Sequence, residues 1–232
     1  MSESSSNNFN HLKIHTQYSI CEGAIKIDDL QDFSKSNKIQ SLALCDTSNL
    51  CGALEFAEKI SKAGTQPIIG TQINFKYADT IGLLPLFALN EEGYKRIIKL
   101  SSQSFLENDE LSDPHIDIEE LLEDNEGVAL FSGTVFGLFG KLFDKGKFSE
   151  IHDLYRKIKS NYNDRFYLEI QRHKDQNELV FEEFNLKKSL ELEIPIIATH
   201  EVFYLVKDMH EAHDALICIG NKTYVNEKNR IK

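Results

Sequence analysis

The 232-residue sequence has only four cysteines, and no two of them form a CxxC pair. Structural zinc sites and disulfide frameworks usually show paired or regularly spaced cysteines. Three of the four lie in apolar or helix-like surroundings, where a free cysteine behaves as a small hydrophobic residue. We therefore expect free, buried thiols at Cys21, Cys45, Cys51 and Cys218.

Long apolar runs are also missing. A helix that spans a bilayer needs about 20 mostly apolar residues, and no stretch of the sequence approaches that length. The first residues, Met1 to Asn8, are polar and acidic, unlike the basic and then apolar start of a secretory signal. We expect a cytoplasmic protein whose residues 1–9, rich in serine and asparagine, are disordered.

Basic residues are scarce. Lys and Arg number 26 against 37 Asp and Glu, which gives a formal net charge of −11 at pH 7. A domain that binds duplex DNA normally presents a basic face to the phosphates. The charge therefore argues against a DNA-binding surface formed by this chain alone. It favours contacts with other proteins, small molecules or basic parts of a larger chain.

A glycine-rich phosphate loop is missing as well, because residues 15–23, after the first predicted strand, contain no GxGxxG. Strand-like and helix-like segments alternate along the chain, which indicates parallel βαβ units. We expect strands at 11–15, 41–45, 66–77, 83–89, 128–132, 165–171 and 194–199. We expect helices at 27–38, 50–62, 91–105, 118–122, 135–143, 148–161, 177–192 and 209–219.

Polar side chains that can bind metal stand where several of these strands end. They are His15, Asp46, Gln72, His173, His200 and Glu201. In α/β barrels, residues at the carboxyl ends of the strands build the site. An open doubly wound sheet and a closed barrel both fit the alternation. Polar residues spread over many strand ends, rather than gathered at one crossover point, favour the barrel.

Several blocks of the sequence resemble a known family. The blocks are residues 11–19 (HLKIHTQYS), 43–56 (ALCDTSNLCGALEF), 62–70 (KAGTQPIIG), 167–173 (YLEIQRH), 197–205 (IATHEVFYL) and 212–219 (AHDALICI). In order and spacing they are similar to the N-terminal PHP (polymerase and histidinol phosphatase) domain of the bacterial DNA polymerase III alpha subunit. The resemblance implies a distorted (β/α)7 barrel over residues 10–220. Residues 221–232 would then begin a linker toward a polymerase core.

By this resemblance, an active PHP site holds a cluster of three metals on His and carboxylate ligands and hydrolyses phosphoesters. Neutral imidazole and carboxylate suit zinc, manganese and iron, and closely spaced metals activate a bridging water. Three ligand positions in the first three blocks are changed in this chain. The first imidazole of an HxH pair falls on Lys13, and the second is retained as His15. The imidazole of an Asp-His pair falls on Thr47, after the retained Asp46, and a Glu falls on Gln72.

The later blocks keep more of the family pattern. His173 is retained, and a segment that reads Asn-Asp-x-His in the family starts with His200 and Glu201 here, which keeps a carboxylate and loses an imidazole. Lys13 would bring an ammonium to the site, where it could neutralise Asp46 or Glu201 in place of a metal. We therefore expect a degenerate site with no metal or other cofactor. The alternative is one residual zinc or manganese ion (Zn or Mn) at His15, Asp46, His173 and Glu201.

The resemblance also implies a function. The catalytic carboxylates of the family's polymerase, which uses magnesium (Mg), lie in a palm domain downstream of the matched region. We therefore expect this stretch to lack the nucleotidyltransferase activity of a DNA-directed DNA polymerase and to serve as a catalytically inactive module of DNA replication. It would have a structural and subunit-docking role.

The expected partners are the rest of the alpha chain, the separate proofreading exonuclease subunit and other replisome proteins. DNA would be contacted mainly through the parent chain, and no membrane is involved. The alternative function is a metal-dependent phosphoesterase or 3′–5′ exonuclease that acts in proofreading. A free-standing small-molecule phosphatase fits the blocks less well.

Overall fold

The computed structural model describes residues 9–108, 112–227 and 230. Strands and helices alternate along the chain as the sequence predicted, with boundaries within about three residues of those expected. The disordered segment expected at 1–9 lies outside the described residues except for Phe9. The linker expected at 221–232 is described only up to residue 227 and at residue 230.

The described residues form a mixed sheet of nine strands. The strands are β1 (Lys13–Ile14), β2 (Ser41–Thr47), β3 (Gln66–Tyr77), β4 (Thr80–Ala88), β5 (Ile116–Asp117), β6 (Val128–Phe131), β7 (Phe166–Ile170), β8 (Ile196–Ala198) and β9 (Glu201–Val202). Their order is β8-β7-β6-β4-β3-β2-β1-β9, and β5 pairs with β3 outside this path. Both neighbours of β2 and both neighbours of β7 are parallel to them, as βαβ units require.

The expectation of parallel pairing throughout is wrong at β4, which runs antiparallel to both β3 and β6. Only Ala78 and Asp79 separate β3 from β4, and so short a connection makes a hairpin, whereas a parallel crossover needs about a dozen residues. Ala78 takes a left-handed φ of 52°, as tight hairpin turns require. The strand expected from residue 83 therefore begins at Thr80.

The described part of the chain also contains seven α-helices and three short 3-10 helices, of which the last two in chain order follow the last strand. They are α1 (Ile27–Asn37), α2 (Ala53–Lys62), α3 (Glu91–Leu106), η1 (Ile118–Leu122), α4 (Leu138–Asp144), α5 (Phe148–Tyr162), η2 (Asn163–Arg165), α6 (Glu178–Leu192), η3 (Lys207–Met209) and α7 (His210–Gly220). The Asn90 side chain caps α3 by accepting the Gly93 N–H at 2.9 Å. Gly64, just past α2, has the left-handed φ (82°) expected of it.

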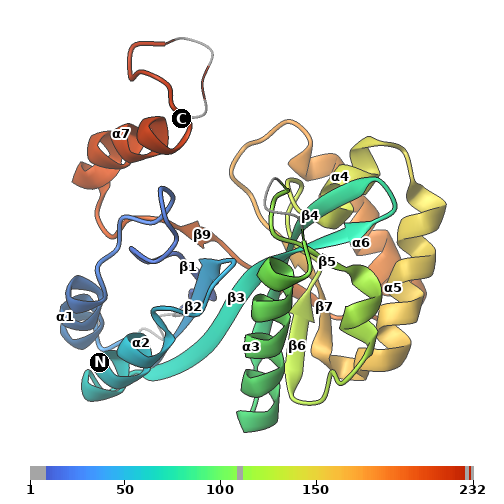
Figure 1. Ribbon diagram of the computed structural model, residues 1–232, viewed down its shortest axis with the longest axis horizontal. Coiled ribbons are helices and arrows are strands. Elements are labelled where there is room, and N and C mark those ends of the chain that lie inside the picture. Colours follow the sequence, from blue (N-terminus) through green and yellow to red (C-terminus); the bar gives the residue numbers. More distant parts are fainter. Residues whose placement is uncertain (1–8, 109–111, 228–229, 231–232) are drawn as a thin grey trace, which may run out of the picture.

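The two end strands of the sheet, β8 and β9, are consecutive in the chain and only Thr199 and His200 separate them. So short a connection brings the two edges of the sheet together, and the sheet curls. Figure 1 shows α1 and α2 on one side of the molecule, α4, α5 and α6 on the other, and the long β3 running between them. The expected α/β fold is confirmed as a mixed sheet that curls toward a barrel.

Successive residues along each strand point to opposite faces of the curled sheet. On the outer face, Leu42 and Leu44 of β2 pack with α1 and α2, and Phe166 and Leu168 of β7 belong to the larger core that includes α5. The inner face carries a smaller cluster of Ala43, Cys45, Phe87, Ala129 and Phe131. The same alternation sends the side chains of Lys13 in β1, of His15 just after it, and of Glu169 in β7 to the inside.

No helix in the described residues is long and apolar enough to cross a membrane. All the cysteines are free, and Cys45 and Cys218 are buried as expected. Cys21 is half-buried, and Cys51 is exposed, which corrects the expectation of burial for that residue. The physical reason is that α2 begins at Ala53, so Cys51 lies in the turn before the helix and has no buried face.

Candidate functional site

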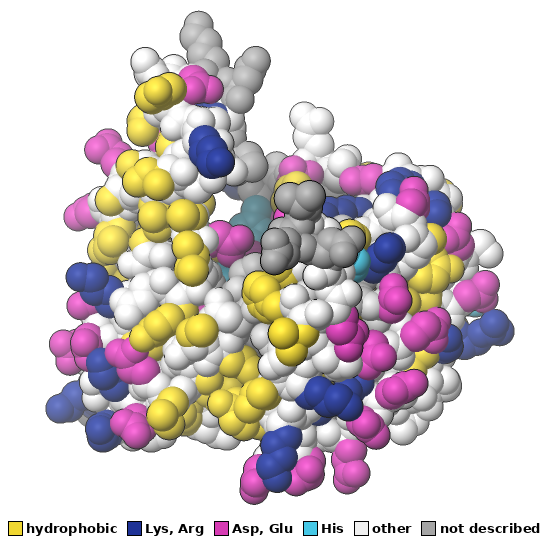
Figure 2. Space-filling view, in the orientation of Figure 1, with side chains coloured by type: hydrophobic (Ala, Val, Ile, Leu, Met, Phe, Trp, Pro, Cys, Tyr) yellow, Lys and Arg dark blue, Asp and Glu magenta, His cyan; other side chains and the backbone are white. Residues whose placement is uncertain are grey.

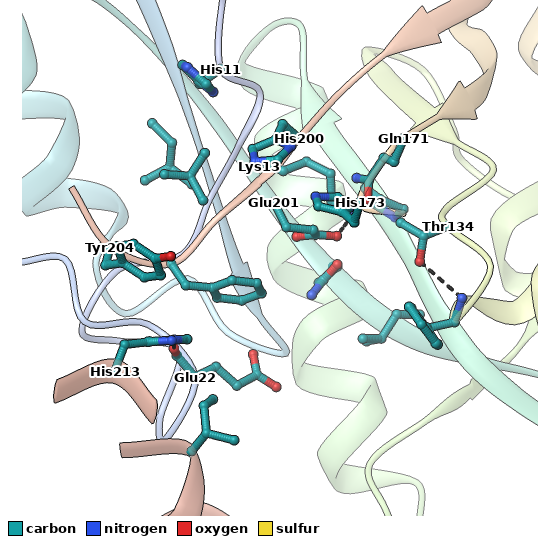
Figure 3. Close-up of a pocket in the computed structure, with 18 of the residues that line it drawn as sticks. His11, Lys13, Glu22, Thr134, Gln171, His173, His200, Glu201, Tyr204 and His213 are labelled. Carbon is teal, nitrogen blue, oxygen red and sulfur yellow. Dashed lines mark hydrogen bonds and ion pairs between the residues drawn. The ribbon is translucent and has the colours of Figure 1, made fainter. Parts of the chain in front are cut away.

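A buried group of charges lies inside the curled sheet (Figure 3). The Lys13 side chain is only 1% exposed, and its Nζ donates to Glu201 Oε1 and lies 3.4 Å from Glu169 Oε1. The second oxygen of Glu201 contacts His15 Nε2. We call Lys13, His15, Glu169 and Glu201 the charge centre.

Hydrogen bonds fix the carboxylate of Glu169. Gln171 Nε2 donates to Glu169 Oε1 at 2.8 Å and to Thr199 Oγ1 at 2.7 Å, and the Thr199 hydroxyl donates to the same Glu169 oxygen. Gln171 follows β7, and Thr199 follows β8. The charge centre is therefore built where β7, β8, β9 and β1 converge.

The charge centre shifts the pKa values of Lys13 and Glu201 in the directions that favour their charged forms. Burial alone would lower the pKa of the Lys13 ammonium, but the carboxylates of Glu169 and Glu201 outweigh this and raise it. Burial alone would raise the pKa of Glu201, but Lys13 and the hydrogen bond with His15 hold it below its usual range. The ammonium therefore acts as a fixed counter-ion to two buried carboxylates.

Asp46 belongs to a separate hydrogen-bonded cluster. Its Oδ1 accepts from the Thr16 N–H at 2.6 Å and from Ser19 Oγ at 2.7 Å, and its Oδ2 accepts from Thr16 Oγ1 at 2.7 Å. All of these donors come from the segment after β1. Of the two acids that the sequence offered as partners for Lys13, the ammonium contacts Glu201, whereas Asp46 is bound by hydroxyls and an amide.

Thr47 and Gln72, the other two changed positions, form a short chain of hydrogen bonds. Gln72 Nε2 donates to Thr47 Oγ1 at 3.0 Å, and that hydroxyl donates to Glu22 Oε2 at 2.6 Å. Gln72 is buried on β3 and lines the same cleft as Lys13. One hydrogen bond between neutral groups thus joins the two residues, and the Thr47 hydroxyl is in turn bound to the Glu22 carboxylate.

His173 and His200 lie together at another part of the site. Their rings are stacked, with centroids 4.4 Å apart. The Glu178 carboxylate, at the start of α6, accepts the His173 N–H at 2.7 Å, and its other oxygen lies 3.2 Å from His173 Nδ1. Burial and the nearby His173 lower the pKa of His200, and burial and His200 lower the pKa of His11. The imidazoles of His200 and His11 therefore favour the neutral form.

One cleft of about 1040 Å³ is lined by several of these groups: Lys13, Glu22, Gln72, Gln171, His173, Glu178, His200 and Glu201. Figure 2 shows a hollow between the part of the molecule that carries α7 and the part that carries α4. In the described residues, the charged side chains on its wall are Lys13, Glu22, Glu178 and Glu201. These four side chains, counted without the histidines, give the wall a formal charge of −2.

The donor set does not fit a metal cluster. In the part of the chain that the structure describes, no three His, Cys, Asp or Glu side chains are arranged to hold an ion. The Lys13 ammonium already occupies the space between Glu169 and Glu201. Burial raises the pKa of the nearby Cys45 well above its usual value, and a thiol binds zinc only as thiolate.

The sequence-predicted residues therefore fall into three clusters. Lys13, His15 and Glu201 meet in the charge centre, Asp46 lies near Thr47 and Gln72, and His173 stacks on His200. Sequence reasoning missed Glu169, Gln171, Glu178 and Thr199 as parts of the site. One signal was available for Glu169, because a lone acid in the apolar strand Phe166–Ile170 indicates a buried polar partner.

Comparisons with known proteins identify the family of this chain. A family model described as the PHP domain matches residues 11–173. The DNA polymerase III subunit alpha of Rickettsia conorii is 38% identical over 224 residues, which cover 95% of this chain and 19% of that protein. The protein of the same name from Borreliella burgdorferi is 34% identical over 235 residues, 97% of this chain and 20% of that one.

A solved structure, an amidohydrolase from Chromobacterium violaceum, has a similar fold. Its TM-score is 0.52 at 10% identity, and the match covers 89% of this chain and 96% of that chain. The chain spans about a fifth of the length of the curated relatives that it matches. The family match over most of the chain, together with the curled mixed sheet, shows that this chain belongs to the PHP domain family.

Proposed function

We propose that this chain is the PHP portion of a DNA polymerase III alpha subunit, and that it acts in DNA replication as a scaffold and docking module without hydrolytic activity. The identity to alpha subunits over nearly the whole chain supports the assignment to that protein. The residues of the cleft support the lack of hydrolytic activity.

The observation that carries this proposal is the position of Lys13 between Glu169 and Glu201. A phosphoesterase of this family needs carboxylates that are free to bind cations, and here an ammonium pairs with both carboxylates and an imidazole contacts Glu201. Phosphate binding also needs positive charge on the wall. Among the described residues, the cleft is lined by one Lys, which is paired, and by three Glu.

A docking role is supported by the character of the surface. The net charge of −11 disfavours direct contact with DNA and leaves proteins as the expected partners. Large apolar side chains are exposed on separate helices, among them Leu106 of α3 and Leu190 of α6. We propose as partners the rest of the alpha chain, the proofreading exonuclease subunit and other replisome proteins.

Metal content and nuclease activity of the purified chain test the inactive assignment. After growth with added zinc and manganese, we expect near-zero metal and no release of nucleotides from a single-stranded 3′ end. Two or more ions per chain, with a nuclease activity that Glu201→Gln abolishes, would contradict the proposal. That result would support the metal-dependent exonuclease instead.

Calorimetric titration with a recombinant exonuclease subunit tests docking. Leu190→Glu and Leu106→Glu place a charge on exposed apolar sites of two different helices and serve as controls for each other. Weaker binding in one variant only would locate the partner on that helix. No binding by the wild-type chain would contradict docking of this subunit.

A further inference from the structure

The curled sheet is not closed by strand pairing. In the described residues, β8 and β9 are the two ends of the hydrogen-bonded order and are not neighbours in it. Strand edges that are left unpaired carry free N–H and C=O groups and separate easily. The ends of the sheet are therefore held by the short connection through Thr199 and His200 and by contacts between side chains inside the curl.

Lys13 and Glu169 connect strands that are far apart along the sheet. The path from β7 to β1 runs through β6, β4, β3 and β2, which makes five steps. Neighbouring strands are about 4.8 Å apart, so a flat sheet would separate β7 from β1 by roughly 24 Å. Lys13 Nζ nevertheless lies 3.4 Å from Glu169 Oε1, because the ammonium reaches across the inside of the curl.

Glu201 completes the connection. It is the register partner of Lys13 across the β1–β9 pair, and its carboxylate binds the same ammonium. Glu169 Oε1 also accepts from Gln171 and Thr199, whereas Glu169 Oε2 has no hydrogen-bond partner among the described residues. The buried Glu169 therefore depends on Lys13 for its compensating positive charge.

We propose that the Lys13 ammonium is a built-in cation that clamps β7, β1 and β9 together and closes the curled sheet, so that the fold needs no divalent ion. This inference rests on the proposed function, in which the site holds no catalytic metal. A lysine side chain cannot be removed by a chelator or exchanged for another cation, so the closure is permanent.

The clamp makes a specific prediction about charge. Removal of the ammonium alone leaves Glu169 and Glu201 buried without their counter-ion, which is costly. Removal of the ammonium together with both negative charges leaves a neutral interior of similar volume, which is tolerated far better. If Lys13 only filled space, the two changes would lower the stability of the protein by similar amounts.

The experiment compares the thermal midpoints of Lys13→Met and of the triple variant Lys13→Met, Glu169→Gln, Glu201→Gln, with Lys95→Met as the control. Lys95 is 57% exposed on α3, and its pairs with Glu91 and Glu92 lie on the surface. We expect Lys13→Met to lower the midpoint by about 10 °C, the triple variant to recover at least half of that loss, and the control to match the wild type.

A Lys13→Met midpoint within about 2 °C of the wild type would overturn the clamp. A triple variant as unstable as Lys13→Met would also overturn it. If the single variant does not fold, a triple variant that folds supports the clamp and one that does not fold overturns it. A wild-type midpoint lowered by EDTA would also overturn it, because a metal would then be closing the sheet. Nuclease activity in a wild-type chain that passes these tests would contradict the proposed function and leave the clamp standing.

Discussion

The imidazole of His200 lies stacked on that of His173, with the ring centroids 4.4 Å apart, inside the cleft. Two stacked imidazoles cannot both take a proton without repulsion between like charges. Burial and then His173 lower the pKa of His200, and burial and then His200 lower the pKa of His11. The folded state therefore favours neutral rings at His200 and His11.

This arrangement predicts a loss of stability in mild acid. An unfolded histidine has a pKa of about 6.5, so the unfolded chain takes up protons at a higher pH than the folded chain does. The contribution of neutral His200 and His11 to the free energy of unfolding is fully present above about pH 6.5 and is lost as the pH falls below that value. We expect the free energy of unfolding in urea to decrease from pH 7.5 to pH 5.5.

His200→Gln separates this effect from the general titration of carboxylates. Glutamine cannot take up a proton, so the variant should lose less stability than the wild type over the same interval. The lowered pKa of Glu201 acts in a different interval, since its contribution is lost only below the carboxylate range, about pH 4.3. Identical slopes for the variant and the wild type would show that His200 does not carry the effect.

Much of the fold could be predicted because the apolar pattern and the helix ends are local signals. Asn90 and Gly64 mark helix ends by their own side-chain and backbone chemistry. The antiparallel β4 was not predicted, because alternation of strands and helices says nothing about a connection too short to hold a helix. The turn at Ala78 carries no glycine to reveal it.

Part of the candidate site could also be predicted from local signals in the sequence. Lys13 and Glu201 stand out as charges beside apolar strands, but their contact depends on the pairing of β1 with β9, 188 residues apart in the chain. Glu169 reaches Lys13 only because the sheet curls. Such a distance is a property of the whole sheet, and no local spacing encodes it.

Glu178 is predicted to fix the segment that carries His173. One of its oxygens accepts the backbone N–H groups of His173 (2.7 Å) and Asp175 (3.1 Å). Glu178→Ala frees both amides, and we expect their hydrogen exchange to accelerate by about tenfold, as the loss of one hydrogen bond implies. Glu178→Gln keeps an acceptor oxygen and should change exchange less. Equal exchange in all three proteins would contradict this role.

Asp46 is predicted to matter as a hydrogen-bond acceptor and not through its charge. In Asp46→Asn the remaining oxygen can still accept from Thr16 N and Ser19 Oγ, and the new amide can donate to Thr16 Oγ1. We expect a loss of about 1 kcal/mol in the free energy of unfolding, against about 3 kcal/mol for Asp46→Ala, which leaves buried donors unpaired.

Urea unfolding of the two Asp46 variants measures this difference. If Asp46 were a metal ligand, loss of the negative charge would be the damaging change, and Asn and Ala would be equally harmful in the metal-loaded protein. Equal losses that appear only when zinc or manganese is present would therefore contradict the role of acceptor.

Metal binding is predicted to return when the three changed positions are restored together. Lys13→His removes the ammonium from the charge centre, and Thr47→His and Gln72→Glu add an imidazole and a carboxylate on β2 and β3. Imidazole and carboxylate are the ligands that zinc and manganese accept. We expect the triple variant to bind at least one zinc ion per chain by calorimetric titration, and the wild type to bind none.

Lys13→His alone is the matched control, because it removes the ammonium and leaves the hydrogen bond between Gln72 and Thr47 in place. An imidazole added beside His15 and Glu201 supplies a third donor but no second cluster of ligands. The zinc affinity of Lys13→His should therefore fall well below that of the triple variant. A triple variant that folds and takes up no zinc would show that Lys13, Thr47 and Gln72 do not stand at ligand positions. The charge centre would then be an independent feature of this chain, unrelated to the metal ligands of the family.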